Sequence, residues 1–212
     1  MIHSDKLRES LCLYLCTDRL LLKGRSLFEA VEAAILGGVS MVQLREKEIT
    51  AREFYALAME LLVLTKRHNI PLIINDRLDI ALAVNAAGVH LGQDDIPLTE
   101  ARRITPRGFV IGVSAHNREE ARRAENEGAD YIGAGAVFPT GTKADAGVIG
   151  PAGLAAIVAS VKIPVVGIGG ISMSNIAEVK AAGAAGAAVI SAILAKDDIR
   201  AAAADLRSIL DK

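Results

Sequence analysis

Three side chains that can bind an anion alternate at the end of one short apolar run. Gln43, Arg45 and Lys47 are separated by single residues, with Val42 before Gln43 and Leu44 between Gln43 and Arg45. Because side chains alternate across a strand, a strand here directs Gln43, Arg45 and Lys47 to one face. Burying that face without partners is costly. The pattern therefore indicates an anion site, with a solvated edge strand as the alternative.

Two later apolar runs end in carboxylates, the ligands that a hard divalent cation prefers. Asn75 and Asp76 follow one run, and Asp94 and Asp95 follow the next. Taken alone, Asn-Asp is typical of an ordinary helix cap or turn. If neighbouring parallel strands bring these ends together, however, Asp76 and one of Asp94 or Asp95 can share Mg²⁺, which needs only one or two carboxylates beside water and phosphate oxygens.

The remaining runs also end in polar or glycine-rich patches. Ser114 is interpreted as a substrate contact or a helix cap, His116 as a weak acid-base candidate, and His90 as a core histidine outside the site. A glycine-flanked loop carries two hydroxyls and an ammonium, which suit an anion. These are Thr140, Thr142 and Lys143.

Two glycine-rich or hydroxyl-bearing turns complete the set. Gly167–Gly170 and Val189–Ala192 follow the last two apolar runs. In barrels, the loops after strands seven and eight often hold a phosphate on backbone N–H groups, which glycine lets the ligand approach closely. This signal indicates phosphate binding without specifying a reaction.

These patches require a scaffold that gathers strand ends, and the chain repeats a strand-then-helix pattern. Apolar runs predict strands at Leu11–Thr17, Met41–Arg45, Leu72–Asn75, Val89–Leu91, Val110–Ser114, Tyr131–Gly133, Val165–Ile168 and Ala188–Ile190. Helices are predicted at Ser4–Glu9, Leu27–Leu36, Ala51–Arg67, Asp79–Asn85, Leu98–Ile104, Arg118–Glu127, Pro151–Val158, Ile176–Ala182 and Ala201–Leu210. Eight such units in 212 residues predict a single-domain (β/α)8 TIM barrel spanning residues 1–212. An open doubly wound sheet is the alternative, although Gly167–Gly170 lacks the full dinucleotide-loop spacing.

Composition agrees with one soluble globular domain. Apolar residues make up 51% of the chain and the formal net charge is −1, which argues against a nucleic-acid partner. Apolar runs are too short for a membrane span and the N-terminus does not resemble a signal peptide, so a cytoplasmic location is expected. Cys12 and Cys16 are expected to share a face of the first strand as reduced thiols.

Taken together, the patches resemble the thiamine-phosphate synthase family over nearly the whole chain, from Tyr14 to Ile193. The segments that carry the resemblance are Gln43-Leu44-Arg45-Glu46-Lys47, Asn75-Asp76-Arg77, Gly88-Val89-His90-Leu91-Gly92-Gln93-Asp94-Asp95, Phe138-Pro139-Thr140-Gly141-Thr142-Lys143 and Gly167-Ile168-Gly169-Gly170. Each segment alone is weakly specific, and the combination is specific.

The resemblance implies a role for each matching residue. It assigns the aminopyrimidine diphosphate to Gln43, Arg45, Lys47 and Asn75, and Mg²⁺ to Asp76 and Asp95. It assigns the pyrimidine amino group to Ser114, the pyrophosphate to Lys143, and the thiazole partner to Thr140 and Thr142. The thiazole phosphate is assigned to Gly170, Ile190 and Ser191. Catalysis is expected from Arg45, Lys47, Ser114 and Lys143.

The implied reaction joins a pyrimidine diphosphate to a thiazole phosphate with loss of pyrophosphate. Departure of pyrophosphate precedes attack by the thiazole nitrogen on a pyrimidine carbocation, so no protein nucleophile is needed. Two alternatives stay open. A thiazole tautomerase-like isomerase on the same barrel is disfavoured by Asp76 and Asp95 together with Arg45 and Lys47. A non-catalytic sensor of phosphate ligands is the other.

Overall fold

The computed structural model describes residues 4–141 and 147–212, and within them eight short strands close into a parallel barrel. Each strand pairs with the next one in the chain, and β8 returns to pair with β1. The strands are β1 (Leu13–Cys16), β2 (Met41–Leu44), β3 (Leu72–Asn75), β4 (Gly88–Leu91), β5 (Val110–Ala115), β6 (Tyr131–Ala134), β7 (Val165–Ile168) and β8 (Gly186–Val189). The predicted TIM barrel is confirmed.

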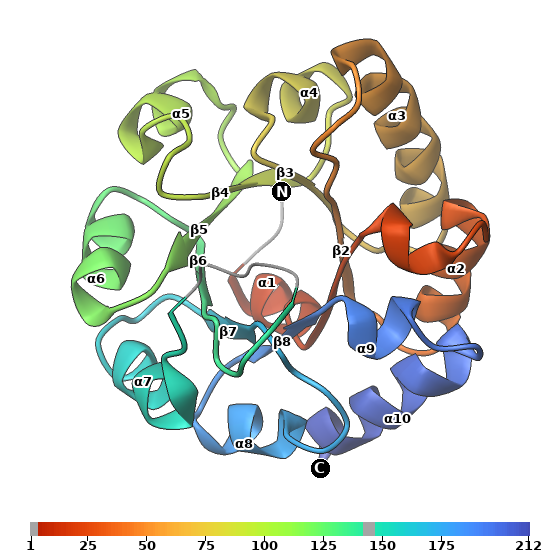
Figure 1. Ribbon diagram of the computed structural model, residues 1–212. Coiled ribbons are helices and arrows are strands. Elements are labelled where there is room, and N and C mark those ends of the chain that lie inside the picture. The colour runs from red at the N-terminus through yellow and green to blue at the C-terminus, as the bar shows by residue number, and fades with distance from the viewer. Residues whose placement is uncertain (1–3, 142–146) are drawn as a thin grey trace.

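The helices lie around the outside of this barrel, except for α1, which is seen at its centre (Figure 1). They are α1 (Ser4–Ser10), η1 (Arg19–Leu22), α2 (Leu27–Leu36), α3 (Ala51–Arg67), α4 (Leu78–Ala83), α5 (Leu98–Ile104), α6 (Arg118–Asn126), α7 (Gly150–Val158), α8 (Ile176–Ala181), α9 (Ser191–Leu194) and α10 (Ile199–Asp211). Helix ends follow local chemistry. Thr50 and Glu53 form a capping box at the start of α3, and Gly128 takes a left-handed conformation (φ 97°) just beyond α6.

Two short helices and the bounds of the eighth strand differ from the sequence prediction. The 3-10 helix η1 and the four-residue helix α9 were not predicted. The eighth strand begins at Gly186, two residues before the predicted start, because backbone pairing with β1 and β7 recruits small residues of low strand propensity. As a result Ile190 lies beyond the strand, and Ser191 is the first residue of α9.

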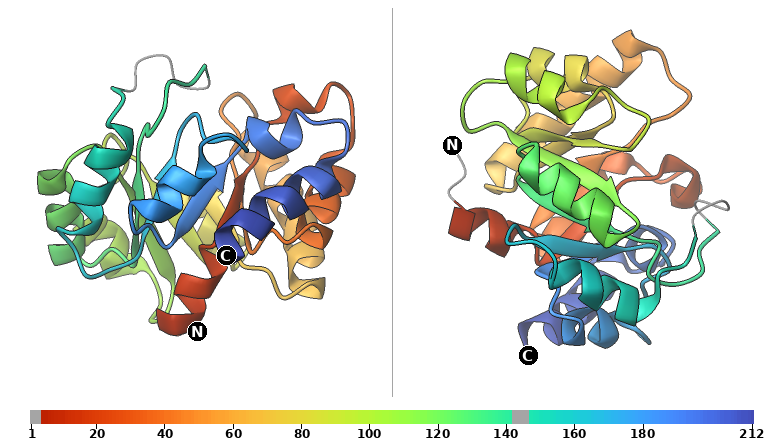
Figure 2. Two further views of the ribbon diagram at one scale, coloured as in Figure 1. Left: turned by 90° about the horizontal axis from the view of Figure 1, so that it is seen from below. Right: turned by 90° about the vertical axis from the view of Figure 1, so that its left-hand side faces the viewer.

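The apolar interior has two layers. The larger one lies between the strands and the helices. The smaller layer fills the inside of the barrel, where alternate residues of the strands direct their side chains. It comprises Leu7, Leu11, Tyr14, Cys16, Met41, Ile73, Val110, Tyr131, Val166 and Ala188. Helix α1 lies at the amino ends of the strands (Figure 2), where Leu7 joins the inner layer. The barrel is therefore closed at that end.

The two cysteines occupy different environments, which corrects the expectation that they share a face. Cys16 lies in the inner layer, where burial raises the pKa of its thiol to about 12. Cys12 precedes β1 and lies near the charges of Arg207 and Asp211 on α10. Both thiols are free.

Across residues 4–141 and 147–212, no helix has the length and apolar character needed to cross a membrane.

Candidate active site at the carboxyl ends of the strands

A cavity of about 140 Å³ opens at the carboxyl ends of the strands, and every strand or the loop after it contributes to its lining. Eight of the predicted site residues line this cavity: Gln43, Arg45, Asn75, Ser114, Thr140, Gly170, Ile190 and Ser191. Their positions in the sequence span most of the chain. The barrel brings them together because parallel strands present their carboxyl ends at one edge.

Three further predicted residues in the described part of the chain are not in the cavity lining. Lys47, Asp76 and Asp95 lie beside the cavity and form what we call the charged rim. Thr142 and Lys143 fall outside the described residues.

Strand β2 supplies the first polar side chains of the cavity. Gln43 is buried, and its Nε2 donates to the Tyr14 hydroxyl at 2.8 Å. Arg45 follows the strand directly, and its backbone N–H donates to Thr17 Oγ1 at 3.0 Å. The predicted alternation is confirmed for Gln43 and Arg45, which both line the cavity. Lys47 instead reaches the end of β3, with Nζ 2.6 Å from Asp76 Oδ2.

The charged rim places two carboxylates next to each other. Asp76 adopts a left-handed backbone (φ 62°), which is unusual for a residue with a side chain. Asp95 Oδ2 accepts the Gly92 N–H at 2.6 Å. Burial raises the pKa of Asp95, the Gly92 hydrogen bond opposes that shift, and the neighbouring Asp76 carboxylate adds to it. Asp94 is exposed, so Asp95 is the residue that faces Asp76.

Two adjacent carboxylates are suitable ligands for a hard cation. Within the described ranges, no group of three or more His, Cys, Asp or Glu side chains is placed to hold a metal. Asp76 and Asp95 therefore offer a sparse, all-oxygen donor set. That set fits Mg²⁺, which keeps several positions for water and phosphate oxygens, better than it fits Zn²⁺.

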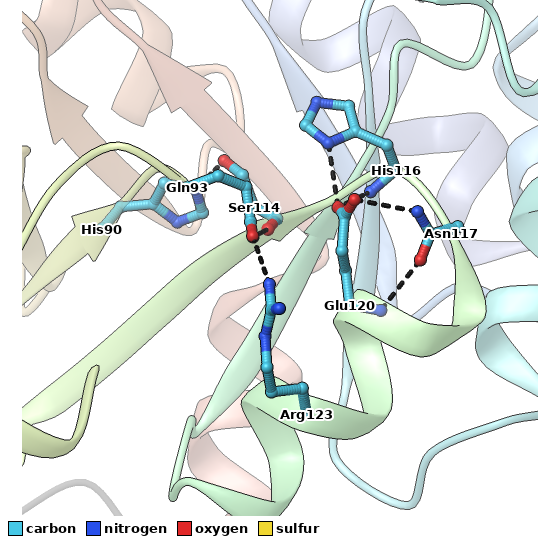
Figure 3. Close-up of polar contacts among 7 residues, drawn as sticks. All are labelled: His90, Gln93, Ser114, His116, Asn117, Glu120 and Arg123. Atoms are coloured by element: carbon cyan, nitrogen blue, oxygen red, sulfur yellow. Dashed lines mark hydrogen bonds and ion pairs between the residues drawn. The ribbon is translucent and has the colours of Figure 1, made fainter. Parts of the chain in front are cut away.

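Ser114 is held from two sides near the end of β5 (Figure 3). Its hydroxyl lies 3.0 Å from His90 Nε2, and its carbonyl accepts Gln93 Nε2 at 2.6 Å. Arg123 of α6 in turn donates to Gln93 Oε1 at 2.7 Å. These contacts fix both the side chain and the backbone of Ser114, which favours its reading as a cavity residue over that of a helix cap. The cap of α6 is in fact Asn117.

His116 lies at the edge of the cavity with one ring nitrogen already engaged (Figure 3). Its Nδ1 lies 3.0 Å from Glu120 Oε2, and the same oxygen accepts the His116 backbone N–H at 2.8 Å. Burial opposes the shift, yet the hydrogen bonds from His116 hold the pKa of the Glu120 carboxyl below its ordinary value. This pairing orients the ring.

Sequence reasoning missed a connected polar set beneath the cavity. His90 is nearly buried, as expected for a core histidine, but it also lines the cavity. Tyr14 and Tyr131 are fully buried, and their hydroxyls are 2.9 Å apart. We call Gln43, Tyr14, Tyr131, His90 and Ser114 the buried row. The sequence did offer one signal for this set: Tyr14 and Tyr131 both lie in predicted strands, and a hydroxyl that is buried in a barrel needs a hydrogen-bond partner.

The loops after β6 and β7 pack against each other at the cavity. A Cβ at Gly170 (φ 65°) would lie 2.7 Å from the Phe138 carbonyl oxygen and would also meet that of Pro139. Gly170 is thus required by close backbone packing as well as by its left-handed conformation. The sequence analysis explains this glycine by the close approach of a phosphate to the backbone, and the structure adds packing as a second reason.

Comparisons with known proteins agree with this geometry. The family model described as thiamine monophosphate synthase matches residues 13–193. The thiamine-phosphate synthase of Clostridium novyi (strain NT) is 54% identical over 198 residues, covering 93% of this chain and 97% of its own. That of Clostridium tetani (strain Massachusetts / E88) is 48% identical over 200 residues, covering 94% and 96%.

A comparison with solved structures indicates the same family. Thiamine phosphate pyrophosphorylase from Pyrococcus furiosus superposes with a TM-score of 0.91 at 46% identity, covering 97% of this chain and 98% of that one. A 3-hexulose-6-phosphate synthase, at 20% identity and a TM-score of 0.67, shares the fold alone. On sequence, fold and the residues gathered at the strand ends, the chain belongs to the thiamine-phosphate synthase family.

Proposed function

We propose that this barrel condenses 4-amino-2-methyl-5-hydroxymethylpyrimidine diphosphate with hydroxyethylthiazole phosphate, giving thiamine phosphate and pyrophosphate. The observation that carries the proposal is the gathering of anion-binding and hydroxyl side chains from all sides of one cavity in a member of this transferase family. A phosphorylated product made from phosphorylated precursors suits an enzyme of the cytoplasm.

The pyrimidine diphosphate is assigned to the side of the cavity formed by β2 and β3. Gln43, Arg45 and Asn75 line the cavity there, and Lys47 lies beside it. Guanidinium and ammonium groups neutralise the two phosphates. Ser114 on β5 is proposed to contact the pyrimidine amino group.

The thiazole phosphate is assigned to the opposite side. Gly170, Ile190 and Ser191 line the cavity where the loops after β7 and β8 meet, and Thr140 lies on the adjoining loop. This separation keeps the two anions apart while their reacting carbon and nitrogen atoms meet over the barrel axis. Thr142 and Lys143, which lie outside the described residues, keep the roles that the family resemblance implies.

Asp76 and Asp95 are the residues that would hold Mg²⁺. When bound, the ion neutralises negative charge on the departing pyrophosphate. Burial and, to a smaller extent, the neighbouring Asp76 carboxylate raise the pKa of Asp95, and a bound cation would stabilise its charged form, which supports this assignment.

The protein's contribution to the chemistry is electrostatic and positional. The carbon–oxygen bond to pyrophosphate breaks with both electrons going to oxygen, and the thiazole nitrogen then donates its lone pair to the carbon. Arg45 and Lys47 stabilise the charge that develops on the leaving group. Apolar side chains such as Val166, Ile168 and Ala188 line the cavity and limit the access of water, a competing nucleophile.

A product assay tests the proposal. The purified protein is incubated with both substrates, with Mg²⁺ or with EDTA, and thiamine phosphate is measured by mass spectrometry. We expect product only with both substrates and Mg²⁺. Isomerisation of a thiazole phosphate without metal would favour the tautomerase-like alternative. Binding of both ligands without any turnover would favour the sensor.

A further inference from the structure

The buried row is an unbroken series of hydrogen bonds that crosses the barrel interior. Gln43 Nε2 lies 2.8 Å from the Tyr14 hydroxyl, which lies 2.9 Å from the Tyr131 hydroxyl. That hydroxyl lies 2.9 Å from His90 Nδ1, and His90 Nε2 lies 3.0 Å from Ser114 Oγ. The row thus joins Gln43 to Ser114, two residues that the proposed function places on the pyrimidine diphosphate, through Tyr14, Tyr131 and His90.

The barrel makes room for the row with two glycines. A Cβ at Gly112 on β5 would overlap ring atoms of Tyr131, and one at Gly133 on β6 would lie 2.9 Å from His90 Cε1. Glycine weakens a strand interior, so its use here indicates a site where something must approach the backbone closely. Two neighbouring strands therefore accommodate the rings of Tyr131 and His90.

Hydrogen-bond donors and acceptors give the row a direction. The Gln43 amide nitrogen can only donate, so the Tyr14 oxygen accepts from it. The Tyr14 proton then goes to its other partner in the described residues, Tyr131. Tyr131 accepts that hydrogen bond and donates its own O–H to His90 Nδ1. His90 Nδ1 is consequently an acceptor, and the proton of the neutral ring is on Nε2, facing Ser114.

The opposite direction leaves a buried group without a partner. If Tyr131 donated to Tyr14, the Tyr14 oxygen would accept twice and its own proton would have no acceptor in the described part of the chain. Such a buried donor is unfavourable. Burial also raises the pKa values of Tyr14 and Tyr131, which keeps both hydroxyl protons in place.

We propose that Tyr14 and Tyr131 are positioning residues that hold His90 as the Nε2–H tautomer and thereby orient the Ser114 hydroxyl toward the pyrimidine. Ser114 accepts from His90, keeps one lone pair for the pyrimidine amine, and directs its own proton to a ring nitrogen of the same substrate. The tautomer is a property of the ligand-free protein, whereas the effect on the substrate rests on the proposed function.

A double-mutant cycle tests whether Tyr131 acts through Ser114. We expect Tyr131→Phe to keep the fold and to lower kcat/KM for the pyrimidine diphosphate about tenfold, the value of one hydrogen bond, with little change in KM for the thiazole phosphate. In a Ser114→Ala background the same substitution is expected to have almost no further effect. Tyr55→Phe, on the outer helix α3, is the control and should match the parent protein.

Additive losses from Tyr131→Phe and Ser114→Ala would overturn the proposal, since a merely structural tyrosine would affect both backgrounds equally. If Tyr131→Phe does not fold, Tyr14→Phe serves in the same cycle, because it removes a hydroxyl from the same row.

The tautomer can be read without substrate. Nitrogen-15 NMR of labelled ligand-free protein, with His90 assigned by its loss in His90→Asn, should show a protonated Nε2 and an unprotonated Nδ1. In Tyr131→Phe the Nδ1 signal should shift as its donor disappears. A protonated Nδ1 in the parent protein would contradict the inferred direction. This result is independent of whether the protein makes thiamine phosphate, so failure of the proposed function and failure of this inference are distinguishable.

Discussion

The buried row and the charged rim lie within the same barrel mouth, yet their polar groups are satisfied in different ways. In the buried row each hydroxyl, amide and ring nitrogen has a partner within 3.0 Å. In the charged rim Lys47 pairs with Asp76 at 2.6 Å, while the adjacent Asp95 has a raised pKa and stays close to a like charge. Every member of the row already has a hydrogen-bond partner in the protein, whereas the two carboxylates of the rim are proposed to gain a cation as their partner.

This difference predicts that substitutions in the two regions affect stability to different extents. Substituting a member of the row or its neighbours is expected to change the free energy of unfolding, because buried groups lose partners or space. Substituting the rim is expected to change activity with little cost to the fold. The pKa of Asp95 is raised in the folded protein, so the free energy of unfolding falls as pH rises through that pKa. At neutral pH the ionised Asp95 carboxylate therefore lowers the stability of the metal-free protein.

Loss of a rim carboxylate should have the largest effect. We expect Asp95→Asn to lower turnover by roughly a hundredfold and to raise the Mg²⁺ concentration needed, because an amide is a poorer ligand for a hard cation. The free energy of unfolding of the metal-free variant should be no lower than that of the parent protein. Steady-state kinetics across a Mg²⁺ series, with thermal unfolding alongside, measures both.

Asp94→Asn is the matched control, one residue away and exposed. It should leave turnover within a few fold of the parent protein. A larger loss at Asp94 than at Asp95 would show that the metal ligand is the neighbouring residue.

A substitution beside the row should act on stability instead. Gly112→Ala places a methyl group on the Tyr131 ring and is expected to lower the free energy of unfolding by about 3 kcal/mol. Chemical denaturation measures it. Gly147→Ala, where a Cβ meets nothing within 4 Å in the described part of the chain, should unfold like the parent protein. Equal stability of the two variants would mean that Tyr131 can move aside.

Substitution of Lys47, the cation of the rim, should affect binding of the diphosphate and binding of the metal differently. Lys47→Met is expected to weaken binding of the pyrimidine diphosphate about tenfold by removing one charge-assisted contact. Binding of Mn²⁺ to the ligand-free protein should not weaken, because Lys47 no longer competes for Asp76. Calorimetric titrations with each ligand distinguish the two effects, and parallel weakening of both would argue against competition.

The smallest effect is expected at Ser191. Ser191→Ala removes one exposed hydroxyl at the start of α9 but leaves the backbone N–H groups proposed to hold the thiazole phosphate. KM for the thiazole phosphate should rise by less than about threefold. A rise much beyond that would show that the hydroxyl, and not the backbone, is the main contact.

The rim was easier to predict from sequence than the row. Asp76 and the Asp94–Asp95 pair follow successive apolar runs, and strand order is enough to predict that these ends meet, whereas the choice of Asp95 over Asp94 came from the family resemblance. Tyr14 and Tyr131 are 117 positions apart, and nothing local indicates that their hydroxyls meet. Their pairing depends on barrel closure and on the space left by Gly112. The short helix α9 was missed for a similar reason, since four residues give no periodic pattern.

Binding of Mn²⁺, a spectroscopic substitute for Mg²⁺, tests most directly whether the rim is completed by its ligand. Electron paramagnetic resonance of the parent protein should show weak Mn²⁺ binding alone, and binding at least tenfold tighter with the pyrimidine diphosphate present. The increase should be lost in Asp95→Asn. Equal affinity with and without the diphosphate would contradict the account, because the rim would then be a complete metal site by itself.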